Sequence, residues 1–201
     1  MFYSNYEEDG RYSYWRLAGV PTQFRDPGVP AGGGYFSVLG GAQAFGRHLD
    51  EEETFVAQTG ASLAVPGVNL GVGGVGPGFY VKYPNTLDIV NQGWFCVIVV
   101  MSGRSQLLAG IKIPRYLVWM SHRTPSYEPS LKHPKKWHGS FPHFVNQKMV
   151  DRLRANCDGF VSVVSTETVG PEKYYSGVEM NRRVAEGLAD VIGRDRSSLN
   201  L

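Results

Sequence analysis

The stretch Phe95-Cys96-Val97-Ile98-Val99-Val100-Met101 is the most strand-like run in the chain. It is apolar throughout and rich in β-branched residues. Runs of this kind are typical of strands whose two faces are both buried, as in the middle of a parallel sheet. We therefore expect residues 95–101 to form a central strand.

Shorter apolar runs and helical periods alternate on both sides of this strand. The predicted strands are residues 35–39, 65–70, 116–120 and 160–164, and the predicted helices are residues 51–63, 79–90, 144–156 and 178–192. Strands that alternate with helices over short connections indicate a three-layer α/β/α fold around a parallel sheet of roughly five strands. Ligands of such sheets lie at the carboxyl ends of the strands. The loops to inspect are therefore residues 40–48, 71–78, 102–114, 121–142 and 165–176.

Composition narrows the class of protein. Hydrophobic residues make up 42% of the 201 residues and charged residues 19%, which favours a globular chain over a disordered one. The net charge of +2 is too small to indicate a surface that binds nucleic acid. The longest apolar run is too short to span a membrane, and residues 1–8 lack the pattern of a signal peptide. We expect a soluble, cytoplasmic protein with no membrane span.

The first 34 residues differ from the rest. They are aromatic and turn-rich, and they end in a run of glycines and prolines. No helical or strand period holds there, so we expect an N-terminal arm (1–34), a main domain (35–192) and a short tail (193–201). The aromatic side chains of the arm bury either on this domain or on a partner protein.

Four of the loops resemble the sequence blocks of one family. Val38-Leu39-Gly40-Gly41-Ala42-Gln43-Ala44-Phe45-Gly46 is similar to the first block of SGNH (GDSL-type) hydrolases, and Asn69-Leu70-Gly71-Val72-Gly73-Gly74 is similar to the second. Met101-Ser102-Gly103-Arg104-Ser105 and Glu172-Lys173-Tyr174-Tyr175 stand where the third and last blocks belong. The chain is also similar to an uncharacterised bacterial group of SGNH-like proteins. The resemblance implies a flavodoxin-like SGNH sheet.

The catalytic positions depart from the family. The nucleophilic serine corresponds to Ala42, and a methyl group cannot attack a carbonyl. The histidine base corresponds to Tyr175, whose reference pKa is near ~10. Glu172 replaces the orienting carboxylate, and Ser105 replaces the oxyanion asparagine. Gly71, which the resemblance implies as a backbone oxyanion donor, is unchanged. The sequence thus predicts a vestigial site made of Gly40, Gly41, Ala42, Gly71, Gly74, Ser105, Glu172 and Tyr175.

One connection of the predicted sheet is rich in basic and aromatic residues. Its candidate ligand-binding residues, with one from the preceding loop, are Arg104, His122, Arg123, Lys135, Lys136, Trp137 and His138. Such a rim suits an anionic or sugar ligand, while the plain alternative is a solvated loop. The histidines lack the spacing of a zinc site, so we expect no metal and no cofactor.

Two functions remain open at this stage. The first is a catalytically degenerate SGNH-like protein that acts by binding, as an accessory subunit of a larger assembly with a protein partner or as a ligand-binding module. The second is a carbohydrate esterase or O-acyltransferase with a non-standard nucleophile, for which Ser102 and Ser105 are the nearby hydroxyls.

Overall fold

A computed structural model describes residues 12–100, 110–122, 147–165 and 177–195. Five parallel strands form its main sheet: β3 (Phe36–Leu39), β4 (Gly67–Asn69), β5 (Phe95–Val99), β6 (Arg115–His122) and β7 (Gly159–Ser165). Their order is β4-β3-β5-β6-β7, with β5 in the centre. This is the flavodoxin-like order, in which the first strand of the sheet lies beside the second and the third. The predicted parallel sheet and its central strand are confirmed.

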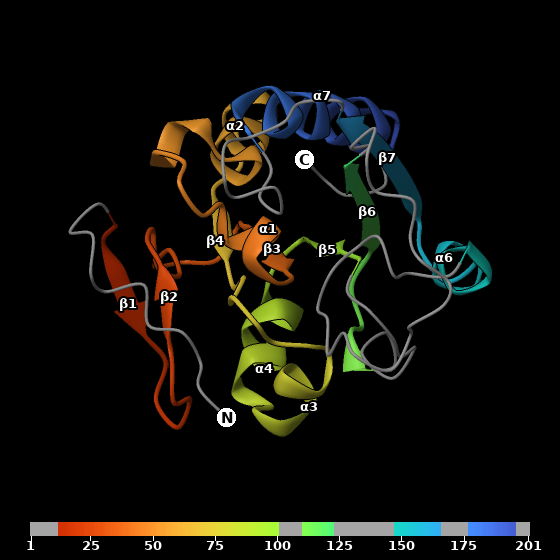
Figure 1. The fold of residues 1–201 in the computed structure, drawn as a ribbon. Coiled ribbons are helices and arrows are strands. Elements are labelled where there is room, and N and C mark those ends of the chain that lie inside the picture. The colour runs from red at the N-terminus through yellow and green to blue at the C-terminus, as the bar shows by residue number, and fades with distance from the viewer. Residues whose placement is uncertain (1–11, 101–109, 123–146, 166–176, 196–201) are drawn as a thin grey trace, which may run out of the picture.

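Helices cover both faces of the sheet (Figure 1). One layer holds α2 (Phe55–Leu63) and α7 (Val178–Arg194), which pack against each other. The other layer holds α3 (Gly78–Lys82) and α4 (Asn85–Gln92). Helix α6 (Gln147–Arg154) lies beside β7. The arrangement is the predicted α/β/α sandwich.

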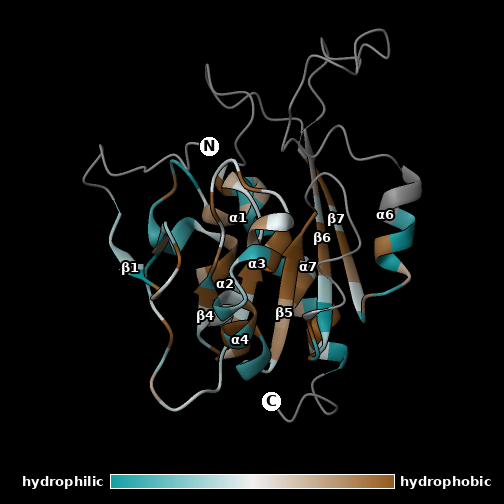
Figure 2. Ribbon diagram, turned by 90° about the horizontal axis from the view of Figure 1, so that it is seen from below, coloured by the Kyte–Doolittle hydropathy of each residue, from teal (hydrophilic) through white to brown (hydrophobic). Residues whose placement is uncertain are grey.

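The core has two halves, one on each face of the sheet. Strand residues alternate between them, so that Val97 and Val99 face α2 and α7 while Cys96 and Ile98 face α3 and α4. All five residues of β5 are buried, as expected for a strand covered on both faces. The central strand β5 is brown, and so hydrophobic, in Figure 2.

Two predicted helices are each interrupted. Residues 51–63 divide into a 3₁₀-helix η2 (Glu51–Glu53) and α2, because Thr54 is extended (φ −71°, ψ 145°) and caps α2 by accepting the N–H of Ala57. Residues 79–90 divide into α3 and α4 at Pro84. The residue before a proline disfavours the helical region, and Tyr83 accordingly has φ −116° and ψ 77°. The last helix continues to Arg194, past its predicted end at Ile192.

The N-terminal segment is more regular than its sequence predicts. The strands β1 (Tyr14–Arg16) and β2 (Gln23–Arg25) form an antiparallel hairpin where no regular structure was expected. Phe24 is fully buried in the core and Trp15 packs on its ring, with centroids 5.0 Å apart. The pairing was missed because three-residue strands are too short to show a period.

No helix within the described ranges is long and apolar enough to cross a membrane.

Candidate functional site

The ends of β3 and β4 meet at the carboxyl edge of the sheet. The N–H of Leu70 donates to the carbonyl of Val38 at 2.9 Å, and the N–H of Val72 donates to the carbonyl of Gly40 at 3.0 Å. Parallel pairing therefore continues past the last strand residues and brings the first two family-like blocks together. This juxtaposition of Gly40 and Gly71 agrees with the sequence prediction.

Tyr80 of α3 joins these two strand ends. Its hydroxyl accepts the N–H of Gly40 at 3.1 Å and lies within donating distance of the carbonyls of Leu70 (2.8 Å) and Gly40 (2.9 Å). The side chain is completely buried, and burial raises the pKa of its phenol far above the usual value near 10. The hydroxyl thus stays protonated, and it adds a buried hydrogen-bond partner for the backbone groups of both strand ends.

Asn69, the last residue of β4, holds the turn that follows. Its Oδ1 accepts the N–H of Gly71 at 2.9 Å, which is an Asx-turn. Its Nδ2 donates to the carbonyls of Ala44 (2.9 Å) and Phe45 (3.4 Å) in the short helix α1 (Ala42–Phe45). The Gly71 N–H, implied above as an oxyanion donor, therefore already has an internal acceptor.

Close packing explains two of the glycines in the blocks. A Cβ atom on Gly71 would lie 2.5 Å from the backbone nitrogen of Phe45. A Cβ atom on Gly40 would lie 2.6 Å from the Cβ of Ala44 and 2.9 Å from that of Val99. Helix α1 consequently sits directly on the strand ends, closer than any side chain at these two positions would permit.

Ala42 is the first residue of α1 and is partly exposed. It follows Gly40 and Gly41 at the end of β3, which is the place that the resemblance assigns to the nucleophile. Gly74 follows β4 in a left-handed conformation (φ +75°) with open space around it. The structure therefore brings Gly40, Gly71 and helix α1 together, and whether they form a vestigial site stays a prediction.

The structure describes only one of the other predicted site residues. His122 is the last residue of β6, at the same carboxyl edge of the sheet. The remaining candidates lie outside the described residues: Ser105, Glu172, Tyr175, Arg104, Arg123, Lys135, Lys136, Trp137 and His138. Their grouping around Ala42 stays a prediction.

Neither cysteine is suited to act as a nucleophile. Cys96 is fully buried in β5, and burial raises the pKa of its thiol to about 12. Burial also raises the pKa of the Cys157 thiol, to about 11. A thiol with such a pKa carries almost no thiolate at neutral pH. No cluster of three potential metal ligands occurs within the described ranges.

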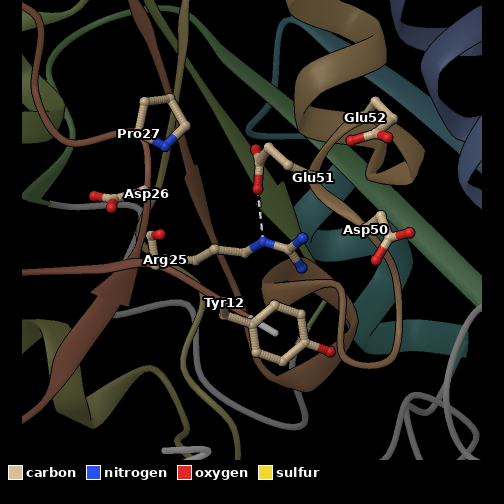
Figure 3. A pocket seen from close by; sticks show the side chains of 8 residues that line it. Tyr12, Arg25, Asp26, Pro27, Asp50, Glu51 and Glu52 are labelled. Atoms are coloured by element: carbon tan, nitrogen blue, oxygen red, sulfur yellow. Dashed lines mark hydrogen bonds and ion pairs between the residues drawn. The ribbon is translucent and has the colours of Figure 1, made fainter. Parts of the chain in front are cut away.

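A cavity of about 620 Å³ lies between the N-terminal hairpin and the segment around η2 (Figure 3). It is lined by four carboxylates, one guanidinium and apolar or small groups: Tyr12, Ser13, Arg25, Asp26, Pro27, Asp50, Glu51 and Glu52. Sequence reasoning did not find this cavity, because its walls come from segments about 25 residues apart.

Arg25 forms the centre of this cavity wall. Its guanidinium donates to the carbonyls of Gly46 and Leu49, both at 2.8 Å, and to that of Phe45 at 3.3 Å. Its Nε donates to Glu51 at 2.6 Å, and the ring of Tyr12 stacks on the guanidinium with 4.6 Å to the ring centroid. With only 3% of its side chain exposed, Arg25 ties the hairpin to the loop after α1.

Burial raises the pKa of Glu51, and the charge of Arg25 opposes that shift. The carboxylate is itself 39% exposed at the cavity rim, so the ion pair with Arg25 contributes little to stability. The contacts with the three buried backbone carbonyls account for most of the contribution of Arg25 to stability, because each carbonyl would lose a charged donor without it.

A family model described as "Domain of unknown function (DUF6473)" matches residues 1–105. The chain belongs to this family. The match covers the hairpin, α1 and the strands β3, β4 and β5, so the DUF6473 pattern includes both strand ends described above. No curated protein matches the sequence.

One similar solved structure is Est24, a carbohydrate acetylesterase from Sinorhizobium meliloti. The two folds superpose with a TM-score of 0.53 over 79% of this chain and 99% of Est24, at 12% sequence identity. At this identity the likeness shows a shared fold. It agrees with the parallel flavodoxin-like sheet that the sequence predicts.

Proposed function

We propose that this DUF6473 protein is a catalytically inactive SGNH-like protein that acts by binding, as an accessory subunit or a ligand-binding module. The observation that carries the proposal is Ala42, which stands at the end of β3 where an SGNH enzyme has its serine. Acyl transfer on this fold begins with attack by that hydroxyl, and alanine has none.

Two further contacts support the proposal. The N–H of Gly71 donates to Asn69, and the N–H of Gly40 donates to Tyr80. An oxyanion hole needs backbone donors that point at the substrate oxygen without an internal acceptor. At both of these strand ends a side-chain oxygen of the protein itself accepts the N–H group, as a substrate oxygen would in an oxyanion hole. This arrangement suits a rigid scaffold better than an acyl-transfer site.

The first test is for hydrolysis and for covalent labelling. We expect the purified protein to hydrolyse p-nitrophenyl acetate no faster than buffer, and a fluorophosphonate probe to leave its intact mass unchanged. Loss of triad residues lowers turnover by roughly 10⁴-fold or more, so a working triad and a vestigial one are easily separated. Stoichiometric labelling of any serine would refute the inactive reading.

An enzyme remains the second candidate, because the similar fold of Est24 carries carbohydrate acetylesterase activity. In that case the nucleophile comes from another position, and Ser102 and Ser105 are the candidates in the sequence. Release of acetate from acetylated sugars that is lost in Ser102→Ala or Ser105→Ala would establish this alternative. Retention of a stable partner from the native host, with no acetate release, would support binding.

A further inference from the structure

Strand β7 is an edge strand with one unused side. It pairs with β6 along all seven residues, from Gly159 to Ser165, and no other described strand pairs with it. Every second residue of an edge strand points its N–H and C=O groups away from the sheet. These groups form a template for a further strand.

The sequence of this edge has none of the usual protection. Residues 159–165 read Gly-Phe-Val-Ser-Val-Val-Ser, with no charge and no proline. Natural sheets blunt an open edge with charges, prolines, bulges or very short strands. The opposite edge strand, β4, is only three residues long and has the N-terminal hairpin beyond it (Figure 1).

Two side chains on one face of β7 are exposed. Val161 and Val163 are buried on the face toward α7, whereas Ser162 is exposed and Val164 is 38% exposed on the other face. Helix α6 lies to the side of β7 (Figure 2). An uncharged edge strand of this length that no helix or loop covers is either paired with another chain or a liability for aggregation.

The edge is complementary to a second copy of itself. In an antiparallel pair related by a two-fold axis at Ser162, Phe160 lies opposite Val164 of the second copy, and Val161 lies opposite Val163. Both pairs match apolar residues on the same face of the joined sheet, and Ser162 lies opposite its own counterpart. No like charges meet anywhere along the seven residues.

We propose that the protein forms a two-fold dimer in which two β7 strands pair antiparallel into one continuous ten-stranded sheet. This goes beyond the proposed function and does not depend on it, because the pairing lies at the edge of the sheet farthest from β4. The partner is a second copy of this chain.

The test places charges at the two-fold axis. In Ser162→Lys two lysines would face each other across the axis, and like charges in that position weaken association by about 10-fold or more. Ser162→Asp has the same effect alone, whereas a mixture of the two variants places Lys opposite Asp and restores the dimer. Ser62→Lys, on the exposed face of α2, is the matched control.

Mass is measured by sedimentation equilibrium over a concentration series, with circular dichroism to verify that each variant is folded. We expect dimers for the native chain, for Ser62→Lys and for the Lys/Asp mixture, and a dimer dissociation constant about 10-fold higher or more for each Ser162 variant alone. If Ser162→Lys fails to fold, Val164→Lys at the exposed neighbour replaces it. A native chain that is monomeric, or a dimer that these variants leave intact, overturns the proposal.

Discussion

Tyr80 and Asn69 show how single polar side chains organise the strand ends. Each is completely buried, and each satisfies backbone groups of a different element. A polar group in the interior is costly unless it is hydrogen-bonded, so these two residues either keep all their partners or destabilise the fold.

Replacement of Tyr80 by phenylalanine tests this role. The ring would keep its packing, but the N–H of Gly40 and the carbonyl of Leu70 would lose the hydroxyl. We expect the free energy of unfolding to fall by about 1–3 kcal/mol in urea denaturation. Tyr83→Phe is the control, because the Tyr83 hydroxyl makes no hydrogen bond within the described residues and should change little. Equal effects of the two substitutions would contradict the bridging role of Tyr80.

Among the elements, the hairpin β1–β2 differs most from what the sequence predicts. A glycine- and proline-rich arm was expected to pack on the surface of this domain or on a partner. Its described part packs on this domain: Phe24 is buried in the core, and Arg25 holds the loop that follows α1. Through that loop the hairpin supports the helix on which Ala42 lies.

Arg25→Met tests whether the hairpin holds this loop. Three buried backbone carbonyls would each lose a charged donor, so we expect the free energy of unfolding to fall by about 2–4 kcal/mol. Glu51→Gln keeps the buried guanidinium and removes only a partly exposed ion pair, so its cost should stay below ~1 kcal/mol. Both are measured by chemical denaturation. A larger loss in Glu51→Gln than in Arg25→Met would mean that the ion pair, and not the carbonyl contacts, holds the hairpin.

At the scale of the whole molecule, the matched family segment is smaller than the folding unit. Residues 1–105 hold three of the five parallel strands, but the central strand β5 also pairs with β6. Helix α2 packs on α7, and the N–H of Phe55 donates to Asn181 Oδ1 at 2.9 Å. The partners in these contacts, β6, α7 and Asn181, all lie beyond residue 105.

A fragment of residues 1–105 should therefore not fold alone. It would expose one side of β5 and the face of α2 that packs on α7, and its remaining core would not offset the loss of chain entropy. We expect no cooperative urea transition by circular dichroism, in contrast to the full chain. A sigmoidal transition for the fragment would show that the family segment is an independent domain.

The fold was predictable because its signals are local. The unbroken apolar run at β5 and the alternation of strands with helices identify a parallel sheet, since both depend on residues close together in sequence. Pro84 also carried a signal of its own, as the residue before it is biased away from the helix. The family-like blocks placed Gly40 and Gly71 at neighbouring strand ends, and there the structure agrees.

The sequence by itself thus determined the layers of the sandwich and the absence of a serine at position 42. Only the tertiary structure decided what surrounds that position. Tyr80 is hydrogen-bonded to Gly40, Asn69 to the carbonyl of Ala44 in α1, and Arg25 to Glu51. The partners in each pair lie about 25–40 residues apart. Periodicity reports which face of an element is apolar, but the acceptor that a buried polar group finds depends on how distant elements pack together.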